Sequence, residues 1–117
     1  MLIVEDDLDT RAALTNMLKL LGHDVAGVST AGDALLKLRA RHFDAVLLDL
    51  VLPDESGAVV LHEIRERKWP VKVAVVTALP TDHKKLADLM ADAVFAKPVD
   101  AFELAGWIGM CAEPRKG

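Results

Sequence analysis

The sequence is poor in the features that mark secreted, membrane-spanning and nucleic-acid-binding proteins. A single cysteine, Cys111, excludes an internal disulfide and favours a cytoplasmic protein. No apolar run approaches the roughly 18 residues of a membrane span, and no basic leader precedes the apolar residues that follow Met1, so we expect no membrane association. The 14 basic and 18 acidic residues give a formal net charge of −4. Because the basic residues are scattered along the chain, we expect no direct contact with nucleic acid.

What remains is the composition of an ordinary globular domain. Hydrophobic residues make up 52% of the 117 positions and charged residues 27%, which excludes a disordered or collagen-like chain. A chain of this length has room for one hydrophobic core. We therefore predict one domain over residues 1–112, followed by a loose C-terminal tail at residues 113–117.

Short apolar runs alternate with segments of helical periodicity along the chain. The apolar runs predict strands at residues 1–5, 25–28, 45–48, 71–76 and 93–96. Apolar residues at helical spacing predict a helix that begins at Thr30 and further helices at residues 8–21, 58–67, 81–90 and 100–111. This alternation is typical of an α/β fold, a five-stranded parallel sheet with helices on both faces. Ligands of such sheets bind beyond the carboxyl ends of the strands.

Polar residues stand at the carboxyl ends of four predicted strands, namely Glu5 and Asp6, Asp49, Thr77 and Lys97. Three carboxylates within about 4 Å of one another repel at about 4 kcal/mol per pair, for an effective dielectric constant of about 20. Lys97 offers one compensating charge. The remaining negative charge and the oxygen ligands suit Mg²⁺, whose coordination shell is usually completed by water and phosphate oxygens. The sequence therefore predicts a magnesium site with phosphate as its companion.

Asp49 is the central carboxylate of this predicted site. Its strand is expected to lie between the acids of the first strand and the hydroxyl and ammonium groups of Thr77 and Lys97. A carboxylate beside a metal ion can attack phosphorus and form an aspartyl phosphate, while a metal and a lysine neutralise the charge of the transferring group. The residue types thus point to phosphoryl transfer onto Asp49.

Four separate motifs resemble the receiver domains of two-component response regulators, in that family's order. They are the acidic run Glu5-Asp6-Asp7, the segment 47–53 with Gly57 eight residues after Asp49, the Val76-Thr77-Ala78 step and the pair Lys97-Pro98. The resemblance covers nearly the whole chain. It implies a flavodoxin-like sheet with strand order 2-1-3-4-5, for which a receiver protein is a standard example.

The resemblance also implies the function. Asp49 would accept a phosphoryl group from a histidine kinase or histidine phosphotransfer protein, in a regulatory domain rather than an enzyme. It would bind Mg²⁺ together with Asp6 and the backbone carbonyl of Val51, and Glu5 would act mainly through a bound water. Thr77 and Lys97 would hold the phosphoryl oxygens, and the Lys97–Pro98 peptide would be cis. Output would pass to a downstream protein target or to an effector domain outside this chain.

One departure from the family pattern concerns signalling. The family usually has an aromatic residue three positions before the lysine, where this chain has Val94. Phe95 cannot simply replace it, because neighbouring residues of a strand point to opposite faces. The predicted helix at 81–90 is also short for the family. We therefore expect phosphorylation chemistry to be retained better than the usual mode of signalling, which needs a two-state element.

Two other classes of function stay open at this point. A receiver-like interaction module that no longer uses phosphate would fit Val94 and the short helix, but not the complete set of acids, threonine and lysine. An enzyme of the haloacid dehalogenase type also phosphorylates an aspartate, but such sites usually carry a second acid two residues further on, where this chain has Val51.

Overall fold

The computed structural model of the chain describes residues 1–78 and 91–111. Within them, five parallel strands form one sheet in the order β2-β1-β3-β4-β5. The strands are β1 (Leu2–Val4), β2 (Ala26–Val28), β3 (Ala45–Asp49), β4 (Lys72–Thr77) and β5 (Ala93–Ala96). The predicted fold class and strand order are confirmed.

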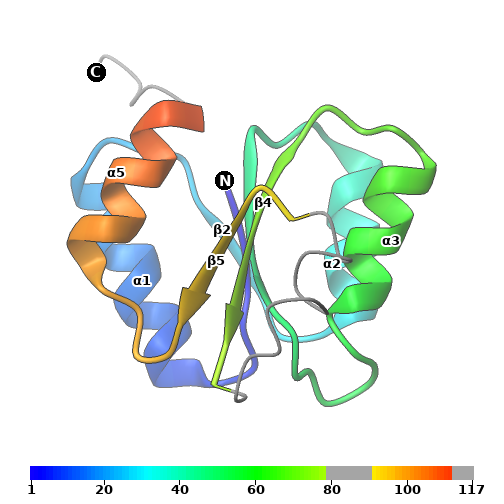
Figure 1. The fold of residues 1–117 in the computed structure, drawn as a ribbon, viewed down its shortest axis with the longest axis horizontal. Coiled ribbons are helices and arrows are strands. Elements are labelled where there is room, and N and C mark those ends of the chain that lie inside the picture. The colour runs from blue at the N-terminus through cyan, green and yellow to red at the C-terminus, as the bar shows by residue number, and fades with distance from the viewer. Residues whose placement is uncertain (79–90, 112–117) are drawn as a thin grey trace.

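Helices cover both faces of the sheet (Figure 1). Helices α1 (Leu8–Leu20) and α5 (Ala101–Cys111) lie on one face, and α2 (Ala31–Ala40) and α3 (Ala58–Glu66) lie on the other. The core is accordingly divided in two by the sheet: Leu2 and Val4 face one layer and Ile3 faces the other. This alternation is the period of two of a strand. With helices on both faces, every residue of β1 and β3 is buried.

Two strands end one residue later than the sequence predicts. Strand β3 includes Asp49, and β4 includes Thr77, which pairs with Ala96 of β5. The reason is that backbone pairing continues past the last apolar residue: Leu50 N donates to Val76 O at 3.3 Å. Asp49 and Thr77 therefore belong to the sheet rather than to the loops after it, and their positions are fixed by the ladder.

The loop after β3 folds back onto the end of its own strand. Gly57 N donates to Leu50 O at 2.8 Å, and Val51 forms an isolated antiparallel bridge with Ser56. A Cβ on Gly57 would lie 2.1 Å from the backbone oxygen of Asp49. Only glycine permits this approach, and the loop is thereby held against the strand end that carries Asp49.

Three further sequence predictions concern a peptide bond, a helix and the C-terminal tail. The Lys97–Pro98 peptide is cis, as the resemblance implies. The predicted helix at 81–90 and the predicted tail at 113–117 lie outside the described residues. None of the helices within the described residues has the length and the apolar character of a membrane span.

Candidate functional site

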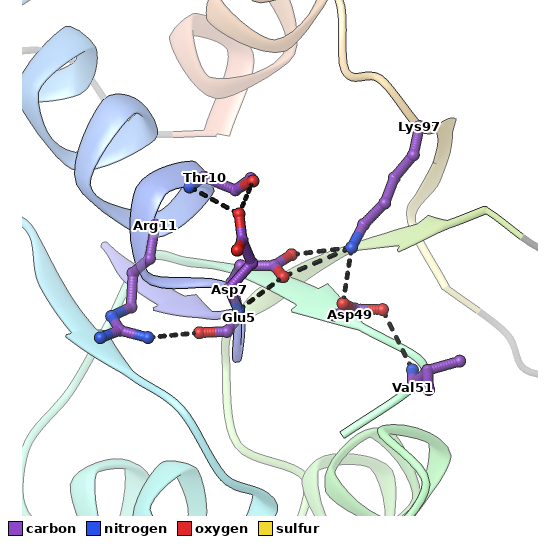
Figure 2. A network of polar contacts seen from close by, with 7 residues as sticks. All are labelled: Glu5, Asp7, Thr10, Arg11, Asp49, Val51 and Lys97. Carbon is purple, nitrogen blue, oxygen red and sulfur yellow. Dashed lines mark hydrogen bonds and ion pairs between the residues drawn. The ribbon is translucent and has the colours of Figure 1, made fainter. Parts of the chain in front are cut away.

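Side chains from three strand ends meet at the carboxyl edge of the sheet (Figure 2). The ammonium nitrogen of Lys97 lies 2.7 Å from Asp49 Oδ2 and 3.0 Å from Glu5 Oε2. Both carboxylate residues are only 4% exposed. The structure therefore joins the ends of the first, third and fifth strands in one partly buried ionic contact, as the strand-end pattern predicts.

Backbone groups hold the two buried carboxylates as well. Val51 N donates to Asp49 Oδ1 at 3.0 Å, so both oxygens of Asp49 have a partner. Asp7 N donates to Glu5 Oε1 at 3.1 Å. A buried charge is tolerated only when it is paired and hydrogen-bonded, and these contacts satisfy that condition.

The ionic contact shifts the titration of its members. Burial raises the pKa of the Glu5 carboxyl above its ordinary value, and the hydrogen bonds from Lys97 and from the Asp7 N–H offset only part of this increase. Burial by itself would lower the pKa of Lys97, but its hydrogen bonds to Asp49 and Glu5 outweigh burial, so the pKa of Lys97 is raised. Lys97 is thus a firmly protonated cation at neutral pH.

The three predicted acids gather as a candidate metal centre. Glu5, Asp6 and Asp49 each offer a carboxylate oxygen, and these oxygens lie within 4.8 Å of one another. Asp6, unlike the other two, is exposed. A set of hard oxygen donors open to water on one side suits Mg²⁺, which keeps several waters and takes one or two carboxylates.

Thr77 and Val51 complete the predicted set. Thr77 is 2% exposed at the end of β4, and its backbone oxygen accepts a hydrogen bond from Lys97 N at 3.1 Å. This backbone contact brings Thr77 beside Lys97 at the site. Val51 lies next to Asp49 through its N–H group, and the role predicted for its carbonyl oxygen stays a prediction.

An apolar cavity opens beside the ionic contact. Its volume is about 510 Å³, and it lies between the sheet, α1 and the turn after β5. Its polar end is formed by Glu5, Asp49 and Lys97, and its apolar lining includes Leu14 of α1 and Val99. The sequence pattern does not indicate this cavity, because it depends on how α1 and the turn after β5 approach each other.

Two further polar contacts near the site have no counterpart in the sequence predictions. Arg11 reaches the backbone of Glu5 from α1, and Asp54 accepts hydrogen bonds from Ala31 N and Gly32 N, both at 3.0 Å. Asp54 thereby links the loop after β3 to the first turn of α2. One feature of the sequence could indicate the contact between Arg11 and the backbone of Glu5. Arg11 follows Glu5 by six residues and lies within the first turns of the next helix.

The structure also shows the surroundings of Val94, which stands where the family usually has an aromatic residue. Val94 is 41% exposed, whereas Phe95 packs on the opposite face against Trp107 of α5, with ring centroids 6.3 Å apart and an interplanar angle of 76°. The prediction that these neighbours face opposite ways is confirmed.

Comparisons with known proteins agree with this geometry. Residues 1–108 match the family model described as the response regulator receiver domain. The transcriptional regulatory protein BasR of Escherichia coli is 39% identical over 105 residues, which is 88% of this chain and 47% of BasR. The regulator DltR of Streptococcus agalactiae is 33% identical over 89% of this chain and 47% of DltR. The chain thus spans about half the length of these curated relatives.

Solved structures of receiver domains are also similar to this chain. A CheY-like receiver domain from Methylobacillus flagellatus superposes with a TM-score of 0.84 at 30% identity, over 95% of this chain and 96% of that one. The receiver domain of a Pseudomonas aeruginosa sensor histidine kinase, solved with a magnesium ion in its active-site cleft, gives 0.84 at 27% identity, with 94% and 93% covered. With its sheet order, its edge of acids and lysine, and a family match over almost its whole length, the chain belongs to the response regulator receiver domains and is a regulatory domain.

Proposed function

We propose that Asp49 is the phosphoacceptor of this domain and takes its phosphoryl group from a phosphohistidine of a histidine kinase or histidine phosphotransfer protein. The observation that carries the proposal is the buried Asp49 carboxylate, with Lys97 Nζ at 2.7 Å and the oxygens of Glu5 and Asp6 within 4.8 Å. A structural ion pair has no need of a third acid beside the two that Lys97 contacts, whereas phosphoryl transfer needs both a nucleophile and positive charge around it.

The chemical step is a direct displacement. An oxygen of Asp49 attacks phosphorus, the bond between phosphorus and the imidazole nitrogen breaks, and the electron pair of that bond leaves with the imidazole. Lys97, already on Asp49 Oδ2, would follow the charge onto a phosphoryl oxygen. The N–H of Val51 holds the other oxygen of Asp49, which fixes the orientation of the nucleophile. Thr77 is proposed to donate its hydroxyl to a second phosphoryl oxygen.

A divalent cation completes this proposal. Asp6, Asp49 and the carbonyl oxygen of Val51 would hold Mg²⁺, with Glu5 acting through a bound water. When bound, the ion supplies positive charge to the phosphoryl oxygens as negative charge builds on them. The same residues would assist both the phosphorylation of Asp49 and the later hydrolysis of the aspartyl phosphate, in which water attacks phosphorus and the Asp49 carboxylate leaves.

The partners follow from the same proposal. Relatives such as BasR are transcriptional regulators about twice as long as this chain, so we infer that the output passes to an effector domain outside it or to a separate protein target. Because the proposed phosphodonor is a histidine kinase or a histidine phosphotransfer protein, we propose that the domain works in the cytoplasm. This chain by itself would make no contact with DNA.

The test is phosphorylation by a small phosphodonor, phosphoramidate, with and without Mg²⁺. We expect an increase of one phosphoryl group in intact mass that needs Mg²⁺ and is lost in Asp49→Asn. Asp44→Asn is the matched control, because Asp44 is an exposed aspartate just before the same strand. Beryllofluoride binding, followed by amide NMR, gives a second readout of the same site.

Two results would contradict the proposal that Asp49 is the phosphoacceptor. Equal mass gain in Asp49→Asn and in the unaltered chain would move the acceptor to another residue. No Mg²⁺-dependent response at all would favour a receiver-like interaction module that does not use phosphate, for which the exposed Val94 at the usual aromatic position is the supporting observation.

A further inference from the structure

The side chain of Arg11 reaches from helix α1 to the backbone of the acidic loop, which is formed by residues 5–7 after β1 (Figure 2). Its Nη1 donates to the backbone oxygen of Glu5 at 2.8 Å. The N–H of Glu5 donates in turn to Val28 O at 3.0 Å. Strand β2 thus holds the peptide group between Val4 and Glu5. The next peptide group, between Glu5 and Asp6, is held through its oxygen by a side chain 6 residues further along the chain.

Strand β2 makes room for this side chain by having no side chain of its own at one position. Gly27 lies under the stem of Arg11: a Cβ there would be 3.2 Å from Cδ and 3.3 Å from Cγ of Arg11. Such distances are shorter than ordinary van der Waals contact, so any larger residue would push the stem away. Gly27 and Arg11 thus form one contact between β2 and the acidic loop.

Asp6 depends on this contact more than its neighbours do. Glu5 is fixed by Lys97 and by the Asp7 N–H, whereas the carboxylate of Asp6 makes no hydrogen bond to the residues that the structure describes. Asp6 nevertheless has an oxygen within 4.8 Å of those of Glu5 and Asp49. With no such contact, the Asp6 carboxylate is carried by its own backbone, and the oxygen of the peptide group that precedes Asp6 is the one that Arg11 holds.

We infer that Arg11, seated on Gly27, is a positioning residue that aims Asp6 into the metal centre and so sets the affinity for Mg²⁺. This inference rests on the proposed Mg²⁺ site. The sign of the effect is diagnostic, because the charge of a guanidinium close to the acids opposes a cation. If Arg11 acted only through its charge, its removal would tighten Mg²⁺ binding; if it positions Asp6, removal weakens binding.

The experiment is a Mg²⁺ titration of the full chain without phosphodonor, followed by amide NMR and by calorimetry. Outer contacts that orient metal ligands are typically worth about tenfold or more in metal affinity, so we expect Arg11→Ala to weaken Mg²⁺ binding by about tenfold. Arg11→Lys keeps the charge and one donor and should recover part of the loss. Arg39→Ala, an exposed arginine on α2, is the matched control and should leave the affinity unchanged.

Gly27→Ala tests the same contact without removing any polar group. We expect it to weaken Mg²⁺ binding less than Arg11→Ala does, and to have no further effect in the double variant, because both changes act through one contact. An alanine in a strand is intrinsically favoured over glycine, so a loss of Mg²⁺ affinity without a loss of thermal stability separates positioning from general destabilisation.

Three results would overturn the inference. Unchanged or tighter Mg²⁺ binding by Arg11→Ala, in a variant with a dispersed amide spectrum, would show that Arg11 does not position Asp6. Additive losses in the double variant would show that Gly27 acts independently of Arg11. Absence of Mg²⁺ binding by the unaltered chain would remove the proposed metal site itself, and this inference with it.

Discussion

Strands β3 and β5 each bring a charged residue to the site, but from opposite environments. All five residues of β3 are buried, including Asp49. In β5 the burial alternates between partly buried and exposed residues, and the side chain of Lys97, just beyond its end, is 28% exposed. The acid comes from the centre of the sheet, and the cation that neutralises it comes from the edge.

The difference shows how the two halves of the ionic contact are fixed. Asp49 is held by the core around its strand and by the loop that folds back through Gly57. Lys97 depends mainly on its partners, because within residues 1–78 and 91–111 the strand before it pairs with β4 alone. Changes near β3 should therefore act through packing and backbone geometry, and changes near β5 should act through charge.

The largest expected effect is that of Gly57→Ala at the central strand. A Cβ there would meet Asp49 O at 2.1 Å and Leu50 Cα at 3.0 Å, and backbone atoms cannot move aside as a flexible side chain can. We expect a loss of about 3 kcal/mol or more in the free energy of unfolding, measured by urea denaturation.

Gly106 is the matched control beside the edge strand. It lies inside α5, where an added Cβ would meet nothing within 4 Å. Gly106→Ala should stabilise the domain by about 0.5 to 1 kcal/mol, because alanine is the better helix former. A similar destabilisation by both changes would contradict the role assigned to the loop after β3.

Removal of the cation from the edge should have the next largest effect. Without Lys97, two carboxylates that are 4% exposed lose their counter-charge, and breaking such a pair leaves charge buried without compensation. We expect Lys97→Met to lower the free energy of unfolding by about 2 to 3 kcal/mol without Mg²⁺. Saturating Mg²⁺ should recover part of this deficit, as measured by urea denaturation in both conditions.

Lys19→Met is the control for that experiment, since Lys19 is exposed in the last turn of α1. Its effect should be small and independent of Mg²⁺. Equal deficits of Lys97→Met with and without Mg²⁺ would mean that the ion does not take over the role of the lysine.

The packing difference can be measured on two valines that are partners in the sheet. Val75 of β4 pairs with Val94 of β5, but Val75 is 0% exposed and Val94 is 41% exposed. Val75→Ala should cost about 2 kcal/mol, from two buried methyl groups and the cavity they leave, and Val94→Ala about 0.5 kcal/mol or less. Similar losses would show that the edge strand is packed as tightly as its neighbour.

The smallest effect concerns the tether between the loop after β3 and α2. Hydrogen bonds from Ala31 N and Gly32 N hold the pKa of Asp54 below its ordinary value. A lowered pKa stabilises the fold at pH values above the unfolded-state value of about 3.9, and this stabilisation is lost as the pH falls through the native value. The unaltered chain should therefore denature at higher urea than Asp54→Asn at pH 5, and this difference should shrink below about pH 4.

The parallel sheet and the edge that carries the site were predictable from the sequence because they depend on patterns that the chain repeats. Buried parallel strands read as apolar runs, and their polar ends meet at one edge of the sheet whatever the helices do. Glu5, Asp49 and Lys97 could be brought together on this basis. The strand order and the cis peptide before Pro98 were predictable only through the resemblance to a family.

The contacts of Arg11 and Asp54 could not be predicted in the same way. Asp54 lies 23 residues from Ala31, and Arg11 meets Gly27 only because α1 crosses β2 at that point. Neither contact leaves a periodic signal, since each depends on the distance between two packed elements. The ends of β3 and β4 shifted by one residue for a related reason: ladder hydrogen bonds continue through polar residues when the neighbouring strand does.

The edge-on contact of Trp107 with Phe95 has an optical consequence. The chain has two tryptophans and no tyrosine, so emission excited beyond the absorption of phenylalanine comes from Trp69 and Trp107. Trp69 packs against the core on the other face of the sheet. A chain with Trp69→Phe retains a single emitter, seated on the strand that leads to Lys97. The domain therefore carries its own fluorophore at the edge strand, and the packing of that strand can be followed in solution without an attached label.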